Sequence, residues 1–303
     1  NTYMIGVGQK VFEELWERAG DEIDHRIRQR KSFSAPDERQ FAEGGGAAAS
    51  RVLLGLMDQC VIPDELFHAY VGSSIEVQLV RRLILKGAIT DSPALILGDT
   101  GTGKGIIARE IHQYSKRREN KFRSLNCAAI PTELLEMELF GVEKGVIHPA
   151  YPLKIGLWEE VGDGTLFLDE IGDLAATHQA KILHALEERA IRRVGGLKDI
   201  KVTARIIAAT NRDLFSVVQA GHFRDDLYYR LRGFLIRTPA LRDHSSDIPV
   251  LAQFFWQRIT GGSKSMLPKA IVDELQFYRW PGNARELKML LSSLYAFFGK
   301  DNL

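Results

Sequence analysis

The feature that most constrains the fold of this chain is a glycine-rich stretch between an apolar run and a segment with helical spacing. The apolar run, 94–97, suits a buried strand, and the helical spacing begins after Lys104. Glycines let backbone N–H groups approach a phosphate chain, while a helix N-terminus and a lysine add positive charge. The pattern predicts a P-loop that binds a nucleotide through Gly98, Asp99, Thr100, Gly101, Thr102, Gly103 and Lys104, followed by Gly105 and Ile106.

One position departs from the usual P-loop pattern. A serine or threonine normally follows the lysine and contacts Mg²⁺, but Gly105 stands there in this chain. We therefore expect Mg²⁺ to take its protein ligands from elsewhere. The alternative interpretation is a glycine-rich turn that binds nothing. It is disfavoured because strand, lysine and helix all occur in the required order.

The composition is that of an ordinary globular chain. Of its 303 residues, 45% are hydrophobic and 26% charged, and one domain per ~150 residues gives two domains. The net charge of +1 gives no overall basic surface for nucleic acid. Cys60 and Cys127 fit neither a metal nor a disulfide pattern, so we expect a reduced, cytoplasmic setting. No apolar run reaches membrane-spanning length, and the first residue is not Met, so we expect a non-membrane fragment of a longer protein.

The N-terminal part, 1–69, carries no motif with assignable chemistry. Helical spacing at 9–31 and 51–68 flanks a glycine-rich stretch, 32–50, which we interpret as a linker. The first helix is a candidate linker helix, dimerisation helix or end of a preceding domain.

Apolar runs that end in polar residues alternate with helical segments after residue 70. The expected strands are 94–97, 122–127, 164–170 and 204–211, and the expected helices are 75–87, 133–140 and 179–192. This alternation predicts a parallel sheet covered by helices on both faces, with ligands bound at the carboxyl ends of its strands. After Pro239 only helical spacing recurs, at 247–259 and 268–300.

The polar strand ends supply candidate catalytic groups. Asp169 and Glu170 follow an apolar strand, and phosphoryl transfer needs one carboxylate near Mg²⁺ and a group that orients the attacking water. We assign Asp169 to the metal and Glu170 to the water; the alternative is a solvated pair of surface carboxylates. Thr210 and Asn211 end a strand expected between those of Lys104 and Asp169, where a polar side chain can sense the γ-phosphate. The alternative for these two residues is a simple helix cap or turn.

The complete set of motifs resembles a known family. The matching segments are Gly98–Lys104, 126–129, 138–141, Gly164–Leu174, Ala208–Leu214, Gly221–Leu231 and Trp280–Leu287. In this order they are similar to the AAA+ ATPase domain of sigma-54-dependent transcription activators, also called bacterial enhancer-binding proteins. The resemblance covers about 70–303 and implies an αβα sandwich at 70–238 followed by a helical lid at 239–303.

The resemblance also implies an activity, cofactors and partners. The activity is ATP hydrolysis, and the cofactors are ATP and Mg²⁺. The partners are other copies of the chain, in a homo-oligomeric ring of six or seven, and sigma-54 RNA polymerase or another protein client that the ring remodels. Lys104 would bind phosphates, Asp169 the metal, and Glu170 would be the catalytic base. The remaining roles are a switch residue (Asn126), a first sensor (Thr210, Asn211), arginine fingers that enter a neighbouring copy's site (Arg224, Arg230) and a second sensor (Arg285).

Within one copy we expect Arg224 and Arg230 to have no partner. The alternative is that they are ordinary surface arginines, paired with Asp225 or Asp226. Arginine suits the finger role because its charged fork matches phosphate oxygens.

Two departures from the family pattern qualify the resemblance. The family has glutamate after the P-loop lysine, where this chain has Gly105. The family also carries Gly-Ala-Phe-Thr-Gly-Ala in a loop that touches the sigma factor, whereas residues 145–150 read Gly-Val-Ile-His-Pro-Ala. This leaves three hypotheses open: a sigma-54 activator, an ATP-driven remodeller of another client, and a nucleotide-gated scaffold that drives nothing. The residues give no support for DNA binding by this chain itself, because no C-terminal helix-turn-helix is visible.

Overall fold

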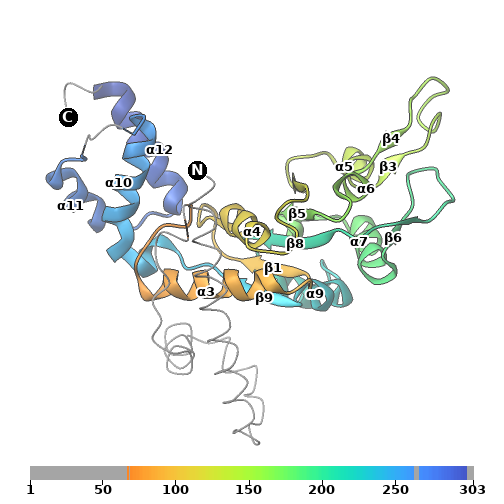
Figure 1. The fold of residues 1–303 in the computed structure, drawn as a ribbon, viewed down its shortest axis with the longest axis horizontal. Coiled ribbons are helices and arrows are strands. Elements are labelled where there is room, and N and C mark those ends of the chain that lie inside the picture. Colours follow the sequence, from red (N-terminus) through yellow and green to blue (C-terminus); the bar gives the residue numbers. More distant parts are fainter. Residues whose placement is uncertain (1–66, 68, 263–265, 299–303) are drawn as a thin grey trace, which may run out of the picture. The chain divides into compact units, whose positions relative to one another are not determined.

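A parallel β-sheet forms the centre of the part that the computed structural model describes, residues 67, 69–262 and 266–298 (Figure 1). Its strands are β1 (Ala94–Leu97), β2 (Phe122–Asn126), β5 (Thr165–Asp169), β8 (Arg205–Thr210) and β9 (Phe234–Arg237). They lie in the order β2-β5-β8-β1-β9, and every neighbouring pair is parallel. The parallel α/β fold is therefore confirmed, with β8 between β5 and the P-loop strand as predicted. The helices and linker expected within residues 1–66, and Cys60, lie outside the described residues.

Helices cover both faces of this sheet. They are α3 (Ile75–Ile89), α4 (Lys104–Gln113), α5 (Thr132–Phe140), α6 (Leu157–Val161), α7 (Ala176–Glu188), α8 (Leu214–Gln219) and α9 (Asp225–Leu231). Alternate strand residues point to opposite faces, so Leu166 packs in one cluster with side chains of α5, α7 and α9. Its neighbour Thr165 points the other way and hydrogen-bonds to His112 of α4, with 2.9 Å between Oγ1 and Nδ1.

Two short hairpins project beyond the sheet. One pairs β3 (Gly141–Val142) with β4 (Lys154–Ile155), and the other pairs β6 (Ala190–Ile191) with β7 (Ile200–Lys201). A bridge between Val142 and Val194 joins them. Arg193 fastens the junction, because its guanidinium donates to Glu143 at 2.9 Å and to Glu159 at 2.7 Å.

The C-terminal part is a helical lid with its own core. Its elements are the 3-10 segment η4 (Leu241–Asp247), α10 (Ile248–Ile259), α11 (Lys269–Phe277) and α12 (Asn283–Phe298). Trp256, Trp280 and Leu287 are buried together in it, and the indole N–H of Trp280 donates to the carbonyl of Leu275 at 2.8 Å. None of the helices in the described ranges combines the length and the apolar character that crossing a membrane requires.

Two local predictions need correction, and one strand of the main sheet was not predicted. The helix expected at 179–192 ends at Glu188, because Arg189 takes a left-handed conformation with φ of 52° and the chain then enters β6. The segment 268–300 forms two helices, because the turn between them contains Pro281, which lacks the N–H that a continuous helix needs. The four-residue strand β9 escapes prediction because so short an apolar run has no distinctive period.

A buried carboxylate joins the start of the described chain to the lid. Asp247 is fully buried, and its Oδ1 accepts hydrogen bonds from the backbone N–H groups of Ser73, at 2.7 Å, and Ser74, at 3.0 Å. Its Oδ2 lies 3.0 Å from Nδ1 of His244. Burial alone would raise the pKa of Asp247, but the hydrogen bonds from His244, Ser74 and Ser73 outweigh it and lower the pKa to about 2.

This network predicts an acid-dependent contribution to stability. A carboxyl group whose pKa is depressed by folding stabilises the protein above its unfolded pKa, near 4, and loses that contribution as pH falls toward 2. We expect Asp247→Asn to lower the free energy of unfolding by about 2 kcal/mol at pH 7 and to flatten its fall between pH 5 and pH 3. Urea unfolding at several pH values measures this.

The matched control is Asp273→Asn, which changes an exposed carboxyl group of α11. It should leave both the stability and its pH dependence as in the wild type. An Asp247→Asn protein with the wild-type pH dependence would contradict the role given to this carboxylate.

Candidate functional site

The glycine-rich loop leaves the carboxyl end of β1 and runs into α4. Gly98 admits no side chain, since a Cβ there would lie 1.8 Å from the hydroxyl oxygen of Thr238. Thr102 fixes the loop from inside, because its hydroxyl donates to the carbonyl of Asp99 at 2.8 Å and lies 2.7 Å from the hydroxyl oxygen of Thr238. Gly103 caps α4 with φ of 94°, and α4 therefore presents its N-terminus to the loop. The sequence predicts this geometry of loop and helix N-terminus, which suits phosphate, and phosphate binding by these residues stays a prediction.

Lys104 is the first residue of α4, and its side chain folds back over the loop. The residue is buried, and its Nζ donates to the carbonyls of Gly98 at 2.9 Å and Asp99 at 3.3 Å. The same Nζ lies 3.9 Å from Oε1 of Glu170. Burial lowers the pKa of Lys104, while the carboxylates of Glu170 and Asp169 oppose that shift. The cation is thus held in the loop by carbonyl oxygens and a nearby carboxylate.

The two candidate carboxylates end β5 beside the loop. Asp169 closes the strand, and one of its carboxylate oxygens accepts the N–H of Glu170 at 3.1 Å. Glu170 takes a left-handed conformation with φ of 52°, which is uncommon for a residue with a side chain. Its Oε2 accepts the backbone N–H of Asn211 at 3.1 Å. The Glu170 carboxylate is therefore placed between Lys104 and the end of β8.

The two candidate sensor residues face different directions. The Asn211 side chain donates to the hydroxyl of Thr100 at 2.9 Å and so joins β8 to the P-loop. Thr210 is fully buried, and its hydroxyl accepts the N–H of Arg212 at 3.1 Å. The backbone carbonyl of Thr210 accepts the N–H of Gly98 at 3.3 Å. Of this pair, Asn211 contacts the P-loop through its side chain and Thr210 through its backbone.

The lid also contacts the P-loop. Asn283 is buried at the start of α12, and its side-chain amide donates to the carbonyl of Thr100 at 2.8 Å. Gly101 permits this approach, since a Cβ there would lie 2.2 Å from the carbonyl oxygen of Gly282 and 3.1 Å from Cβ of Arg285. Arg285 lines a cavity of about 620 Å³ together with Thr100. The predicted second sensor therefore lies on the P-loop side of the lid.

Asn126 lies at the carboxyl end of β2, in register with Asp169. Its side-chain oxygen accepts the N–H groups of Ala128 at 2.9 Å and Ala129 at 3.2 Å. Among the described residues no hydrogen bond joins it to Glu170, whose carboxylate is held by Asn211 instead. The switch role of Asn126 stays a prediction.

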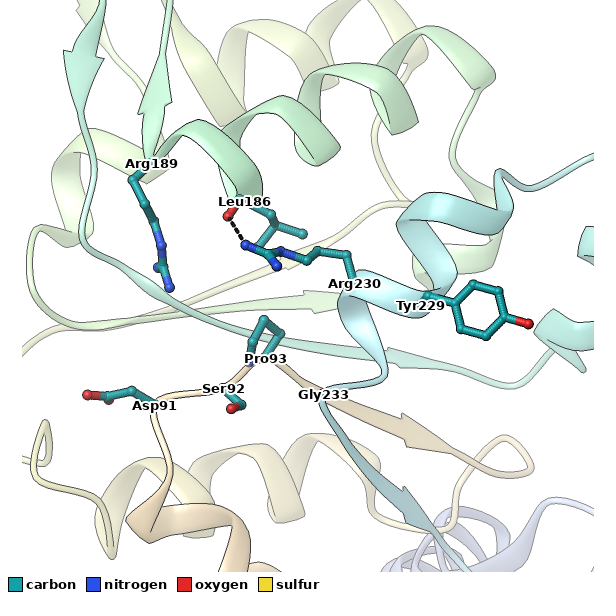
Figure 2. A pocket seen from close by; sticks show the side chains of 8 residues that line it. All are labelled: Asp91, Ser92, Pro93, Leu186, Arg189, Tyr229, Arg230 and Gly233. Carbon is teal, nitrogen blue, oxygen red and sulfur yellow. Dashed lines mark hydrogen bonds between the residues drawn. The ribbon is translucent and has the colours of Figure 1, made fainter. Parts of the chain in front are cut away.

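Of the two candidate finger arginines, Arg224 and Arg230, the structure places Arg230 away from this site. Arg230 of α9 lines a pocket with Asp91, Ser92 and Pro93, which precede β1, whereas the P-loop follows β1 (Figure 2). The prediction that they lack partners within one copy is wrong. Arg224 forms a two-point ion pair with Asp226, at 3.0 and 2.7 Å. Arg230 donates to the carbonyl of Leu186 at 3.2 Å.

The described part of the chain provides few ligands of its own for a metal. In the described ranges, no group of three or more His, Cys, Asp or Glu side chains is arranged to hold a metal ion. Mg²⁺ is commonly bound through one or two carboxylates and substrate phosphates, with water completing the shell. Asp169 beside the phosphate loop fits that requirement. Gly105 adds no ligand, although a Cβ there would make an ordinary contact of 3.7 Å with Phe167.

Several residues of the site escape prediction from the sequence. Asn283 holds the lid to the loop, Arg242 of η4 forms an ion pair with Asp99 at 3.1 Å, and Thr238 contacts Thr102. The signal for Asn283 is its place after Pro-Gly, where a left-handed residue is common and asparagine tolerates it. Arg242 and Thr238 carry no such signal. Ile106, predicted to complete the nucleotide site, lies partly exposed in the first turn of α4.

Known proteins are similar to this chain in sequence and in fold. Residues 70–237 match the family described as Sigma-54 interaction domain, and residues 242–303 match the AAA+ ATPase lid domain. The DNA-binding transcriptional activator HyfR of Escherichia coli K12 is 48% identical over 207 residues, covering 67% of this chain and 31% of that protein. The Nif-specific regulatory protein of Azotobacter vinelandii is 46% identical over 225 residues, which cover 73% of this chain and 43% of that protein.

A solved structure gives the same result. NtrX from Brucella abortus, in complex with ADP, superimposes on this chain with a TM-score of 0.71 and a sequence identity of 36%. The superposition covers 77% of this chain and 52% of the NtrX chain. The chain spans less than half the length of the two curated relatives.

The geometry predicts that nucleotide affinity depends on Lys104. Lys104→Ala removes the cation that the loop carbonyls hold, and a charged hydrogen bond of this kind is worth about 1.5–3 kcal/mol. Calorimetric titration with ATP should therefore show an affinity lower by about 10- to 100-fold.

Gly105→Ala is the matched control one residue further along α4. A Cβ fits there, so ATP affinity should be unchanged, and replacing a helical glycine should raise the free energy of unfolding by up to about 1 kcal/mol. Unchanged affinity in Lys104→Ala would contradict the assignment of the loop.

Proposed function

The chain belongs to the Sigma-54 interaction domain family of AAA+ ATPases, and on this basis we propose that it hydrolyses ATP as the motor of a transcription regulator. The proposal includes a ring of identical copies and the remodelling of a protein client. The observation that carries it is the meeting of three separate segments at Thr100, the P-loop residue to which Asn211 and Asn283 both donate hydrogen bonds. A nucleotide at this loop would touch the core, the strand ends and the lid together.

The residues of this site suit ATP hydrolysis. The N–H groups of the loop and Lys104 bind and neutralise phosphate oxygens. Glu170 accepts a proton from the attacking water, and the N–H of Asn211 orients its carboxylate. Asp169 would hold Mg²⁺, and the bound ion would neutralise charge on the phosphates. Arg285, which lines a cavity with Thr100 of the P-loop, would be the lid cation that contacts the nucleotide.

The position of Arg230 supports a ring. Arg230 is at the amino end of β1 and the P-loop at the carboxyl end, so a strand of four residues, about 13 Å, separates them. Arg230 would therefore act on the nucleotide of a neighbouring copy. Its hydrogen bond to the neutral carbonyl of Leu186 would be exchanged for a stronger one to a charged phosphate.

We expect hydrolysis to depend on Glu170 separately from binding. Glu170→Gln keeps the shape and can still accept the N–H of Asn211, but it cannot take a proton. ATP affinity should persist while turnover falls by about 100-fold or more, the scale of losing a general base. Phosphate release and calorimetry measure the two quantities.

Glu119→Gln serves as the control, because Glu119 is an exposed carboxylate that pairs with Arg118 and contacts none of the site residues named above. Its turnover should equal that of the wild type. If Glu170→Gln also turned over normally, another group would have to be the base.

A second candidate function is remodelling of a client other than sigma-54, and the loop between β3 and β4 favours it. The tip is closed on itself: Gly145 donates to the carbonyl of Tyr151 at 3.0 Å, and Tyr151 donates to that of His148 at 2.8 Å. The N–H of Ala150 donates to Nδ1 of His148 at 3.2 Å. Pro149 fixes one φ of the same turn. A client would meet the exposed side chain of Ile147 in place of an aromatic ring and a threonine.

The two candidate functions differ in their prediction for sigma-54 binding. The unaltered chain should hydrolyse ATP but bind purified sigma-54 weakly or not at all, with or without a transition-state analogue. The triple variant Ile147→Phe, His148→Thr, Pro149→Gly should bind more strongly, because it restores the aromatic group and frees the turn. Its ATPase rate serves as the control and should not change. Strong nucleotide-dependent binding by the unaltered chain would favour the sigma-54 activator.

A further inference from the structure

A few described residues other than glycine take the left-handed backbone conformation. The described residues include four of them: Glu170, Arg189, Trp280 and Asn283. Glu170 is the candidate base, and Trp280 and Asn283 flank the lid turn that contacts the P-loop. Strained conformations of this kind cluster at functional sites. Arg189 is the one of the four that lies outside the ATP site described above.

Arg189 lies at the C-terminus of α7, with φ of 52° and ψ of 35°. It lines the same pocket as Arg230, a hollow of about 480 Å³. Figure 2 shows that the two side chains enter this pocket from different elements, Arg189 from the end of α7 and Arg230 from α9. The left-handed turn at Arg189 is the point where the chain leaves the helix for β6.

The charges in this pocket are not balanced. Its carboxylate, Asp91, already accepts a hydrogen bond from Arg117 at 2.9 Å. Arg230 donates to a neutral carbonyl, that of Leu186. Within the described part of the chain, the guanidinium of the exposed Arg189 forms no ion pair and no hydrogen bond. Two guanidinium groups thus share a pocket that lacks a free anion, and a ligand with negative oxygens would satisfy both.

We propose that Arg189 acts beside Arg230 as a second cation for the phosphate oxygens of the ATP bound to a neighbouring copy. The inference rests on the proposed function, since it requires a shared ATP site. Two planar forks that approach from different elements suit a tetrahedral phosphoryl group, which offers several oxygens. The chain's own nucleotide is out of reach, because the pocket adjoins the amino end of β1 and the P-loop its carboxyl end.

The test uses Arg189→Gly, because glycine adopts the left-handed conformation without strain and the variant should fold. Its melting temperature should equal or exceed that of the wild type, and its affinity for ATP in calorimetry should be unchanged. Its ATP turnover at high protein concentration should fall about 10-fold or more. Arg189→Lys keeps the charge but loses the fork, so its turnover should be intermediate.

Lys201→Ala is the control. It removes a positive charge from the exposed residue that pairs with Ala190 in the adjacent hairpin, and its turnover should match the wild type. Mixing Arg189→Gly with Lys104→Ala should restore part of the activity, because one chain then supplies an intact P-loop and the other both arginines. Arg230→Ala should behave as Arg189→Gly does in both experiments.

Two results would overturn the assignment of Arg189 alone. One is wild-type turnover by Arg189→Gly at every protein concentration while Arg230→Ala loses activity. The other is a loss that the mixture fails to restore, which would place the bound anion within a single copy. By contrast, wild-type turnover that does not vary with protein concentration would overturn the shared site itself, and with it the ring.

Discussion

Two hydrogen bonds to Thr100 hold the candidate ATP site together. One comes from Asn211 at the end of β8, and the other from Asn283 at the start of the lid helix α12. Thr100 lies between Gly98 and Gly101, whose missing side chains let Thr238 and the Gly282 carbonyl come close. The loop is therefore fixed by contacts from three distant parts of the sequence. A displacement of the lid would be transmitted directly to the loop residues that we propose contact phosphate.

The electrostatics of the loop follow from burial. Lys104 is held by two carbonyl oxygens and lies 3.9 Å from Glu170, so both charges are kept near the place where phosphate oxygens would lie. Glu170 accepts the backbone N–H of Asn211 from a strained backbone conformation. Such pre-organisation lowers the stability of the free protein, and a bound nucleotide would offset this loss because its phosphate oxygens would interact with Lys104.

The sheet separates two regions that carry cationic side chains. At the carboxyl end of β1, Lys104 and Arg285 surround the P-loop, and at the amino end Arg189 and Arg230 share a pocket. In one copy these regions cannot meet, because a strand lies between them. In a ring, the proposed assembly would bring one region of each copy against the other region of its neighbour. Activity would then depend on contact between copies, even though each copy contains every residue type needed.

The sequence by itself determined the parts of this protein that depend on local pattern. A strand, a glycine-rich loop, a lysine and a helix define the P-loop, and the apolar runs ending at Asn126, Asp169 and Thr210 define a parallel sheet whose polar ends lie together. Only the tertiary structure decided the contacts between distant segments. These include the bond from Asn283 to Thr100, the pairing of Glu170 with Asn211 in place of Asn126, and the partners of Arg224 and Arg230. Periodicity reports which face of an element is buried, whereas a side-chain partner depends on how folded elements meet, and that is set by packing across the whole domain.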